Sequence, residues 1–365
     1  MIPHSRPSLG REEREAIEEV LNSGQIAQGK KAAEFERNFA NLVGRRYAVA
    51  VSSGTAALEL SLRALKIGAG DEVVFPSYTC VSLLHAVEAV GALPVLADID
   101  LEDLNLSVPE AKKKLRKKTK GLIVPHAFGR PARMGEFEKL GVPVIEDGTQ
   151  ALGARITGKK VGSFGALSVF SFYATKMITT GEGGMVVTDS RPIAETLRDL
   201  RDYDKKEFHL FRTNSKMTDL EAAMGIEQAK KLPRFIERRR AIARRYREAL
   251  QKSSAILPAE DAERDHVYYR FVIRVPKEAQ HWLNRLQARG VDAKEPVFKA
   301  VHESLRESDS RFPASTQAMQ ECLSLPIYPS LTEEECCAVL EALRAESARP
   351  RRDGIRRRPL KVVTA

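Results

Sequence analysis

The sequence predicts an α/β fold, with a large domain built on a mainly parallel seven-stranded sheet and a smaller C-terminal α+β domain. Seven short, apolar and mostly β-branched runs alternate with helical stretches, which is the pattern of parallel strands buried on both faces. After about residue 250 this pattern changes, which places the end of the large domain there. The seven runs lie at residues 48–52, 72–75, 93–97, 122–125, 143–146, 166–172 and 185–188.

The C-terminal part carries its own element signals. Residues 266–275 alternate between apolar and polar side chains, as a half-exposed strand does. A helix is expected over 279–289, because Gly290 follows in the position that closes a helix. Thr332 and Glu335 have the spacing of a capping box and should open a last helix. The predicted divisions are a large domain at 1–250, which includes an N-terminal segment and a linking helix, a small domain at 251–346 and a basic tail at 347–365.

The composition is that of a folded chain, since 43% of its 365 residues are hydrophobic. No apolar run approaches the roughly 20 residues of a transmembrane helix, and the first residues lack the apolar core of a signal peptide. The four cysteines show no paired spacing, so we expect neither a structural zinc nor a disulfide framework. These observations predict a cytoplasmic protein without a membrane segment or a bound metal.

The net charge of +10 raises the question of whether the chain binds nucleic acid. Half of this surplus lies in the last 25 residues, which carry eight Arg or Lys against three acids. Two further basic runs lie at 112–118 and 238–245. None of these runs interleaves aromatic side chains as a surface for single-stranded nucleic acid does. We interpret the runs as solvated surfaces, and nucleic acid is not an expected partner.

A phosphate-binding loop is the first of three features that point to a cofactor. Ser53, Gly54 and Thr55 close the first predicted strand and open a helix. The N–H groups at a helix N-terminus are unpaired and attract an anion, Gly54 permits a close approach, and the two hydroxyls add donors. An ordinary N-cap would have the same sequence, so this motif is informative only together with the next two.

An acid at a strand end is the second feature. Asp147 follows the apolar run at 142–145, at the carboxyl edge of the predicted sheet, where α/β folds bind ligands. There its carboxylate can pair with a protonated pyridine nitrogen, and Gln150 can hydrogen-bond the ring hydroxyl. The alternative role for Asp147 is a helix cap.

A lysine between a strand and a glycine turn is the third feature. Lys176 follows the strand at 166–172 and precedes the glycine-rich turn at 181–184. An unprotonated lysine can form a Schiff base with a carbonyl and later move a proton as a general base. Ser171 lies just before it, where it can reach a phosphate. A phosphate loop, an acid and a lysine in this order predict a site for pyridoxal phosphate (PLP).

Four motifs in a fixed order carry a resemblance to a known family. They are Ser-Gly-Thr-Ala-Ala-Leu at 53–58, Glu-Asp-x-x-Gln-Ala-x-Gly-Ala at 146–154, Ser-Phe-x-x-x-Lys at 171–176 and Gly-Glu-Gly-Gly-Met at 181–185. Further matches lie at 70–73, 98–100, 214–223 and 325–331. Together they resemble the DegT/StrS family of PLP-dependent sugar aminotransferases, which have fold type I. The resemblance extends over nearly the whole chain and fails only in the basic tail.

The resemblance implies a role for each matched residue. Lys176 would form the Schiff base with PLP, Asp147 would pair with the pyridine nitrogen, and Gln150 would contact the ring oxygen. Such enzymes are homodimers that share their active sites, so Asn214 would reach the phosphate bound in the neighbouring subunit. The residues that would hold the phosphate within one subunit are Ser53, Gly54, Thr55 and Ser171.

The resemblance also implies the reaction. Glutamate or glutamine would donate the amino group, and a keto sugar, usually carried on a nucleotide diphosphate, would accept it in a ping-pong sequence. Relatives that act as sugar dehydratases have histidine in place of the Schiff-base lysine, so the presence of Lys176 favours the aminotransferase.

Several positions depart from the family pattern or leave a role open. Cys80 stands where relatives have an aromatic side chain that stacks on the cofactor ring; Tyr78 might substitute for it, but we expect Tyr78 to face elsewhere. Lys216 replaces arginine and loses its bidentate fork, and Arg212 lies in an altered segment nearby. We keep Lys216, Arg212 and His126 as candidate substrate contacts, with a structural role as the alternative for His126.

These departures leave two alternatives to the amination of a nucleotide-linked sugar. One is an aminotransferase for a carbonyl compound that carries no nucleotide. The other is a catalytically silent regulatory relative that binds nucleic acid through its basic tail. The intact Lys176, Asp147 and Gln150 argue against the silent relative.

Overall fold

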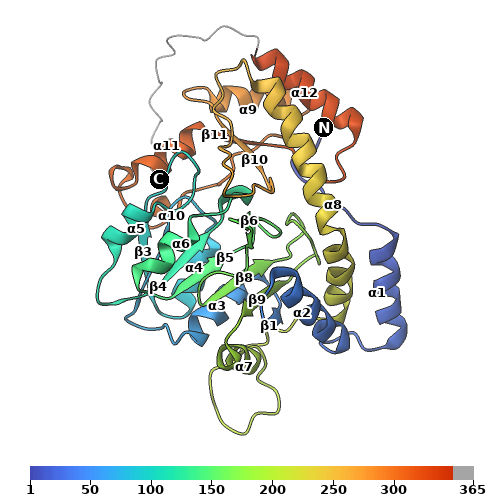
Figure 1. The fold of residues 1–365 in the computed structure, drawn as a ribbon, viewed down its shortest axis with the longest axis vertical. Helices are drawn as coiled ribbons and strands as arrows, with labels where there is room; N and C mark the ends of the chain where they lie inside the picture. The colour runs from blue at the N-terminus through green and yellow to red at the C-terminus, as the bar shows by residue number, and fades with distance from the viewer. Residues whose placement is uncertain (348–365) are drawn as a thin grey trace, which may run out of the picture.

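A computed structural model describes residues 1–347 of the chain and contains one central sheet of seven strands (Figure 1). The strand order is β1-β9-β8-β5-β4-β2-β3. Strand β9 runs antiparallel to both of its neighbours, and the other pairs are parallel. The predicted mainly parallel seven-stranded sheet is confirmed. Its strands are β1 (Tyr47–Val51), β2 (Glu72–Pro76), β3 (Leu93–Ala97), β4 (Thr119–Pro125), β5 (Val144–Asp147), β8 (Leu167–Ser171) and β9 (Gly184–Thr188).

Helices pack around this sheet and continue beyond it. Two short strands that the sequence analysis did not predict, β6 (Arg155–Ile156) and β7 (Lys159–Lys160), form a separate hairpin. Single turns of 3-10 helix occur at η1 (Ala127–Gly129), η2 (Glu138–Leu140) and η3 (Asp309–Arg311). The α-helices of the described chain are α1 (Arg11–Ser23), α2 (Lys30–Val43), α3 (Gly54–Ala64), α4 (Ser82–Ala89), α5 (Val108–Lys114), α6 (Met134–Phe137), α7 (Arg191–Leu200), α8 (Asp219–Leu250), α9 (Ala279–Ala288), α10 (Val301–Ser304), α11 (Pro313–Glu321) and α12 (Glu333–Ser347). Over residues 1–347 no helix combines the length and the apolar character that a membrane crossing requires.

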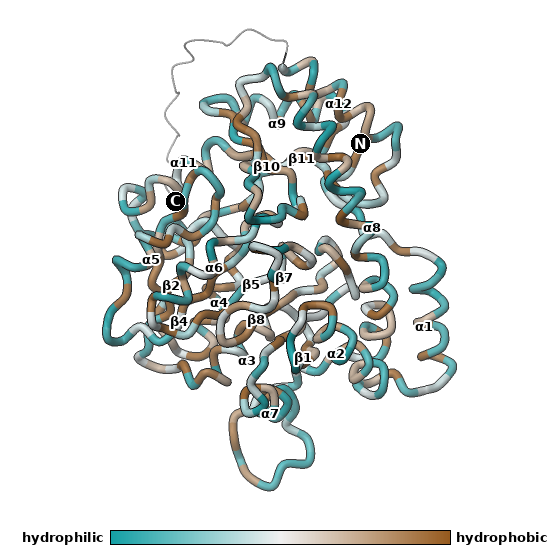
Figure 2. Tube along the Cα trace, viewed as in Figure 1, coloured by the Kyte–Doolittle hydropathy of each residue, from teal (hydrophilic) through white to brown (hydrophobic). Residues whose placement is uncertain are grey.

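Both faces of the sheet are buried, because alternate side chains of a strand point to opposite sides. In β1, Val49 and Val51 pack on one side in a core shared with α3, α4 and α7. Ala48 and Ala50 point to the other side, toward α2 and the first half of α8. Figure 2 shows the hydrophobic positions concentrated in the interior and the hydrophilic ones along outer helices such as α1. This arrangement leaves the edges of the sheet as the place where polar side chains can gather.

A separate hydrophobic core lies where the C-terminal half of α8 meets the end of the described chain. There α8, α9 and α12 pack around β10 (Phe271–Arg274) and β11 (Cys322–Leu325), which pair antiparallel. This is the expected α+β architecture. The division at residue 250 stays a prediction, because α8 contributes to both cores. The tail assigned to 347–365 lies outside the described residues, apart from its first residue.

Two helix signals read from the sequence are confirmed. The helix α9 ends at Ala288, and Gly290 follows with a left-handed φ of 78°. The capping box before α12 is present: the N–H of Thr332 donates to the Glu335 carboxylate at 3.0 Å, and the N–H of Glu335 donates to the Thr332 hydroxyl at 3.1 Å.

The strand expected at 266–275 is shorter than predicted, because β10 takes up only Phe271–Arg274. The backbone of Tyr268 has a left-handed φ of 51°, which interrupts an extended chain. Just before it, the N–H of Val267 donates to the carbonyl of Gly129 in η1 at 3.0 Å. The apolar positions alternate here because they are buried against the part of the molecule that contains the sheet. Only the second half of the stretch at 266–275 pairs as a strand.

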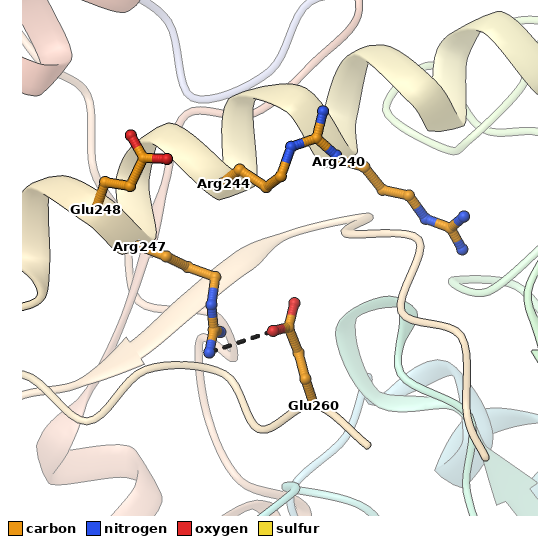
Figure 3. A pocket seen from close by; sticks show the side chains of 5 residues that line it. All are labelled: Arg240, Arg244, Arg247, Glu248 and Glu260. Carbon is orange, nitrogen blue, oxygen red and sulfur yellow. Dashed lines mark ion pairs between the residues drawn. The ribbon is translucent and has the colours of Figure 1, made fainter. Parts of the chain in front are cut away.

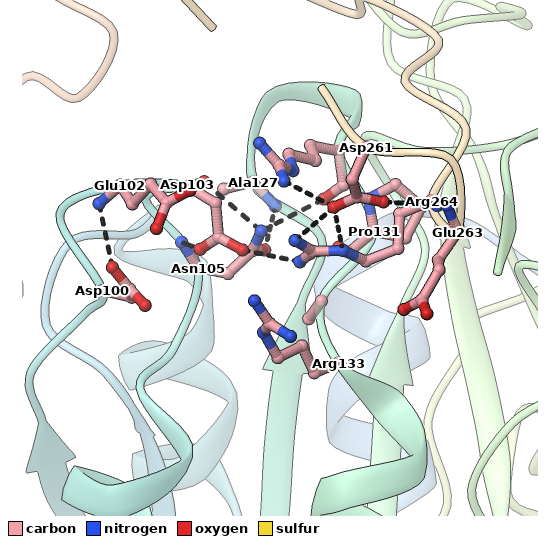
Figure 4. Close-up of polar contacts among 12 residues, drawn as sticks. Asp100, Glu102, Asp103, Asn105, Ala127, Pro131, Arg133, Asp261, Glu263 and Arg264 are labelled. Atoms are coloured by element: carbon pink, nitrogen blue, oxygen red, sulfur yellow. Dashed lines mark hydrogen bonds and ion pairs between the residues drawn. The ribbon is translucent and has the colours of Figure 1, made fainter. Parts of the chain in front are cut away.

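Ion pairs join the segment before β10 to the loops at the sheet edge (Figure 4). Arg264 contacts the carboxylates of Asp103 at 2.6 Å and Asp261 at 2.7 Å, and Arg130 contacts Asp261 at 2.8 Å. Burial acts to raise the pKa of Asp261, but hydrogen bonds from Arg264 and the charge of Arg130 lower it to about 2. These pairs hold the segment that leads to β10 against the carboxyl edge of the sheet.

Replacing Asp219 with alanine is expected to lower the free energy of unfolding by about 3 kcal/mol, since hydrogen bonds to a charged group contribute roughly 1.5–3 kcal/mol. Asp219 is buried at the start of α8, and its carboxylate accepts the N–H groups of Gly29, Lys31 and Ala32 at 2.7, 3.1 and 2.9 Å. It thus caps α2 from a distant part of the chain. Urea unfolding measures the change, with the exposed Asp204→Ala as control. An equal midpoint for both variants would contradict this capping role.

Candidate active site

The predicted cofactor residues gather at the carboxyl edge of the sheet, where the parallel strands end. Asp147 is the last residue of β5 and Ser171 is the last of β8. These two strands are neighbours, with Asp147 opposite Val169. Lys176 lies in the turn after β8, where its N–H donates to the carbonyl of Tyr173 at 2.9 Å. The topology alone therefore brings the acid and the lysine to one edge.

The phosphate loop and Ser171 are in direct contact. The hydroxyl of Ser53 caps α3 by accepting the N–H of Ala56 at 3.1 Å. A Cβ atom added to Gly54 would lie 2.7 Å from the Cβ of Ser171, so only glycine permits this approach. Thr55 is exposed in the first turn. The unpaired N–H groups of that turn and the adjacent hydroxyls form a cradle that fits a phosphate dianion.

Asp147 is buried, with 3% of its surface exposed. Its carboxylate accepts the N–H of Thr149 at 3.0 Å, and no cation pairs with it within residues 1–347. A buried carboxylate normally has a charged or hydrogen-bonded partner. A protonated ring nitrogen at this edge would supply one, so the environment of Asp147 fits the cofactor.

Gln150 is held in place by the backbone of the neighbouring turn. Its side-chain oxygen accepts the N–H of Phe128 in η1 at 2.8 Å. Phe128 has a left-handed φ of 56°, which directs this N–H toward Gln150. The amide nitrogen makes no hydrogen bond to another described residue, and it can donate to a ring oxygen.

Lys176 is half-buried and has no carboxylate partner within residues 1–347. Its Nζ lies 5.3 Å from the centroid of the Tyr269 ring. Burial raises the pKa of Tyr269, but the charges of Lys176 and Arg270 outweigh burial and lower it to about 8. No ion pair within residues 1–347 therefore ties up the amine of Lys176.

Tyr269 and Arg270 lie near the candidate site, and the sequence analysis did not select them. With His4, Ser5, Thr175 and Ile327 they line a narrow cavity beside Lys176. Tyr269 lies within the alternating stretch at 266–275, where its spacing with Val267 and Phe271 predicts the apolar face of a strand. A signal that could have identified the site is the pair of polar and charged side chains at 269 and 270, directly before the apolar core of β10.

The geometry of His126 gives it a structural role. It is fully buried, its Nδ1 accepts the N–H of Ala132 at 2.9 Å, and its Nε2 lies 3.0 Å from the carboxylate of Glu146. Both ring nitrogens are therefore used inside the protein, and neither is left for a substrate. Of the two roles considered for His126, this favours the structural one.

The position expected to stack on the ring is not filled by an aromatic side chain. Cys80 is exposed just before α4. Tyr78 is buried, with its ring centroid 6.1 Å from that of Phe128. Burial raises the pKa of the Tyr78 hydroxyl well above its usual range.

The remaining candidates lie on the segment that follows α7. Arg212 contacts Asp199 at 3.0 Å and Lys216 contacts Asp202 at 2.7 Å, so both cations are paired within their own subunit. The carbonyl of Ser215 accepts the N–H of Ser52 at 2.9 Å, which places this segment beside the phosphate loop. Asn214 is exposed, and its side chain bonds to no other described residue.

A different pocket lies on α8 and shares no residue with the cavity beside Lys176. It is lined by Arg240, Arg244, Arg247, Glu248 and Glu260, with Arg247 and Glu260 paired at 3.3 Å (Figure 3). It holds three arginines against two glutamates, and we assign it no part in the cofactor site because the two cavities share no residue. In the part of the chain that the structure describes, no three His, Cys, Asp or Glu side chains are grouped as metal ligands.

Comparison with known proteins identifies the family to which the sequence is similar. A sequence model described as the DegT/DnrJ/EryC1/StrS aminotransferase family matches residues 7–344. The structure is similar to the aminotransferase TlmJ from Streptoalloteichus hindustanus, with 32% identity, a TM-score of 0.90, and 95% of this chain and 98% of that chain covered. It is similar to S. venezuelae DesV, with 32% identity, a TM-score of 0.89, and coverage of 93% and 95%. The GDP-4-keto-6-deoxymannose-3-dehydratase ColD matches at 24% identity and a TM-score of 0.84, with coverage of 94% and 100%, which shows the fold alone.

Proposed function

Since this chain belongs to the DegT/DnrJ/EryC1/StrS aminotransferase family, as its motifs predicted, we propose that it moves the amino group of glutamate to the keto carbon of a nucleotide-linked sugar. Glutamate would leave as 2-oxoglutarate, and the acceptor carbonyl would become an amine. The observation that carries this proposal is Lys176, which pairs with no carboxylate of residues 1–347 and lies at the same sheet edge as Asp147 and the phosphate cradle. We place the reaction in the cytoplasm.

Each residue at the sheet edge has a task in this reaction. Bound PLP would draw electrons from the substrate carbon, so that this carbon can release a proton. Asp147 would keep the ring nitrogen protonated, and Gln150 would orient the ring through its amide N–H. Lys176, when neutral, would accept the released proton and return it on the other side of the amino group. The cradle of α3 and Ser171 would anchor the phosphate and fix the ring in register with Lys176.

The choice of acceptor rests on the family and on charge. The DegT/StrS family, which the motifs resemble, acts on keto sugars, usually on a nucleotide diphosphate. The net charge of +10 favours an anionic substrate. The fold does not separate aminotransferases from dehydratases, since ColD shares it. Lys176 supports the aminotransferase, because dehydratase relatives have histidine at that position.

The proposal is tested by following the nitrogen. The PLP-loaded protein would be incubated with ¹⁵N-labelled glutamate and a panel of nucleotide-linked keto sugars, and in parallel with the same sugars without the nucleotide. We expect ¹⁵N in a product of the nucleotide-linked panel. Label found only in products of the free carbonyl compounds would replace the proposed acceptor with the non-nucleotide alternative. Label in no product would contradict amination of a keto sugar.

We further propose that two copies of the chain share their active sites. The segment after α7 projects from the body of the molecule (Figure 1). It exposes large apolar side chains, which a partner would cover. The same segment carries Asn214, which would reach the phosphate bound by the other copy. The exposed side chains are Tyr203, Phe208, Leu210 and Phe211.

Mixed dimers test this sharing. A dimer of one Lys176→Ala chain and one Asn214→Ala chain would contain one site with both changes and one site with neither. Co-expression with two affinity tags, followed by tandem purification, isolates that mixed species. We expect about half of the wild-type turnover per dimer, although each single-variant dimer is much weaker. A mixed dimer no more active than the two parents would place Asn214 in its own subunit's site or outside any site.

A further inference from the structure

The pocket outside the cofactor site lies along one stripe of α8 (Figure 3). Arg240, Arg244 and Arg247 are four and three residues apart, so their side chains leave the same face of the helix within about 10 Å along its axis. The facing wall is the chain between α8 and β10, which contributes Glu260. The pocket has a volume of about 400 Å³. This volume is in the range of sites that bind small molecules, so the pocket is large enough for a ligand.

The arginines at the two ends of this stripe are held by backbone carbonyls. The Nε of Arg240 donates to the carbonyl of His266 at 3.1 Å, and the Nη1 of Arg247 donates to the carbonyl of Pro258 at 2.7 Å. The Nη2 of Arg240 lies 3.9 Å from the carboxylate of Asp265, which is too far for a hydrogen bond. A guanidinium has five N–H donors, so each of these contacts orients the side chain and leaves donors for a ligand.

Arg244, in the middle of the stripe, has no partner of its own. Within residues 1–347 its guanidinium forms no hydrogen bond and no ion pair. Figure 3 shows its side chain turned along the helix toward Arg240 and away from Glu248. Like charges at these helix spacings repel each other, and an anion bound between Arg240 and Arg244 would offset that repulsion. A phosphate is the best fit, because its oxygens match the planar fork of the guanidinium.

Two carboxylates in the same pocket make a plain anion an incomplete match. Glu260 accepts a hydrogen bond from the hydroxyl of Tyr268 and lies 3.3 Å from Arg247. Glu248 follows Arg244 by one helical turn, and within residues 1–347 its carboxylate forms no ion pair. A free guanidinium and a free carboxylate in one pocket are complementary to a ligand with a negative and a positive group. A compound that carries a phosphate and a protonated amine has both groups.

We propose that this pocket binds a phosphorylated amino sugar, with the phosphate at Arg240 and Arg244 and the ammonium group at Glu248. The inference rests on the proposed function, because a phosphate-bearing amino sugar is the class of product that the reaction would release. It goes beyond that function, because the pocket shares no residue with the cavity beside Lys176 and would hold such a compound away from the reacting groups. The enzyme would thus have a second binding site for the class of compound that it makes.

Three probes test this pocket by their binding to the PLP-loaded protein. Glucosamine 1-phosphate carries both charged groups, glucose 1-phosphate lacks the amine, and UDP-glucosamine carries the amine with a nucleotide-linked diphosphate. Calorimetry would measure each Kd for the wild type and for Arg244→Gln, Glu248→Gln and Arg234→Gln. The last variant is the matched control, because Arg234 is an exposed arginine of α8 that lies outside the pocket and has no partner in residues 1–347.

We expect the Kd of glucosamine 1-phosphate to be about 10- to 100-fold weaker in Arg244→Gln and about 10-fold weaker in Glu248→Gln, with no change in Arg234→Gln. Glucose 1-phosphate should bind the wild type about 10-fold less tightly, and its Kd should not change in Glu248→Gln. The tighter of the two amine-bearing probes, if its binding depends on Arg244, identifies the ligand as the free sugar phosphate or as the nucleotide-linked form.

Equal Kd values in the wild type and in Arg244→Gln would overturn the proposed pocket, because the probes would then bind elsewhere, for example at the cofactor site. Glucose 1-phosphate that binds as tightly as glucosamine 1-phosphate would also overturn it, because the amine would then not be recognised. If glucosamine 1-phosphate binds through Arg244 but the wild type aminates no keto sugar, the pocket stands and the proposed function fails. If the wild type aminates a keto sugar and Arg244→Gln binds the probes equally well, only the pocket fails.

Discussion

Lys176→Ala is expected to lose turnover by at least about 10⁴-fold, because general-base catalysis alone contributes roughly 10²–10⁴-fold and the covalent link to PLP is lost as well. The protein should still fold, since the Lys176 side chain is half-buried and makes no hydrogen bond or ion pair to another described residue. It should still bind PLP through the cradle around Gly54 and through Asp147, but without a bond to the protein. The variant is therefore a clean removal of one chemical group.

Three measurements separate this result from simple unfolding. Gel filtration and circular dichroism should match the wild type. Borohydride reduction should attach PLP to the wild-type chain and leave the variant unmodified. Lys230→Ala is the matched control, because Lys230 is an exposed lysine on α8 that pairs with Glu227 at 2.6 Å. A Lys176→Ala protein that retains wild-type turnover, or that is still labelled by borohydride, would remove Lys176 from the catalytic role.

Asp147→Asn is expected to bind PLP and to react about 10²- to 10³-fold more slowly, the range observed when one electrostatic contact to a developing charge is removed. The amide has nearly the same shape as the carboxylate and can keep the N–H of Thr149, which Asp147 accepts at 3.0 Å. It cannot hold a proton on the ring nitrogen by charge, so the substrate carbon would release its proton less readily. The rate constant of each half-reaction, and therefore kcat, should fall.

Single-turnover kinetics with deuterium at the α-carbon of glutamate would locate this defect, since a larger isotope effect is expected when proton removal becomes slower. Asp147→Glu provides a second variant that keeps the charge but displaces it. Turnover in Asp147→Asn equal to wild type would separate Asp147 from the ring nitrogen. Loss of PLP binding instead of turnover would make Asp147 a structural residue of the cradle.

The strands whose positions depend on the local pattern of apolar and polar residues could be predicted from the sequence. All seven strands of the sheet coincide with apolar runs, because most of their side chains are buried on one face or the other. The position of Asp147, Ser171 and Lys176 at one edge could be predicted, because a parallel sheet brings the carboxyl ends of its strands together. Order along the chain was enough to predict that they would meet.

The parts that depend on contacts between distant segments were not predictable. Tyr269 and Arg270 reach the cavity because the chain before β10 bonds to η1 instead of pairing as a strand. Asp219 caps a helix 190 residues away in sequence, a distance no local motif reports. His126 could not be assigned until its partners Ala132 and Glu146 were known. In each case a tertiary hydrogen bond decides the role of the side chain.

The most direct test of the central claim is an absorbance scan of the purified protein with PLP, before and after the addition of L-glutamate. We expect the yellow band of lysine-bound PLP, and its bleaching to the spectrum of the aminated cofactor when glutamate is added. This result would establish the first half of the amino transfer. A protein that takes up no PLP, or a yellow band that glutamate leaves unchanged, would contradict transfer from glutamate at the site around Lys176.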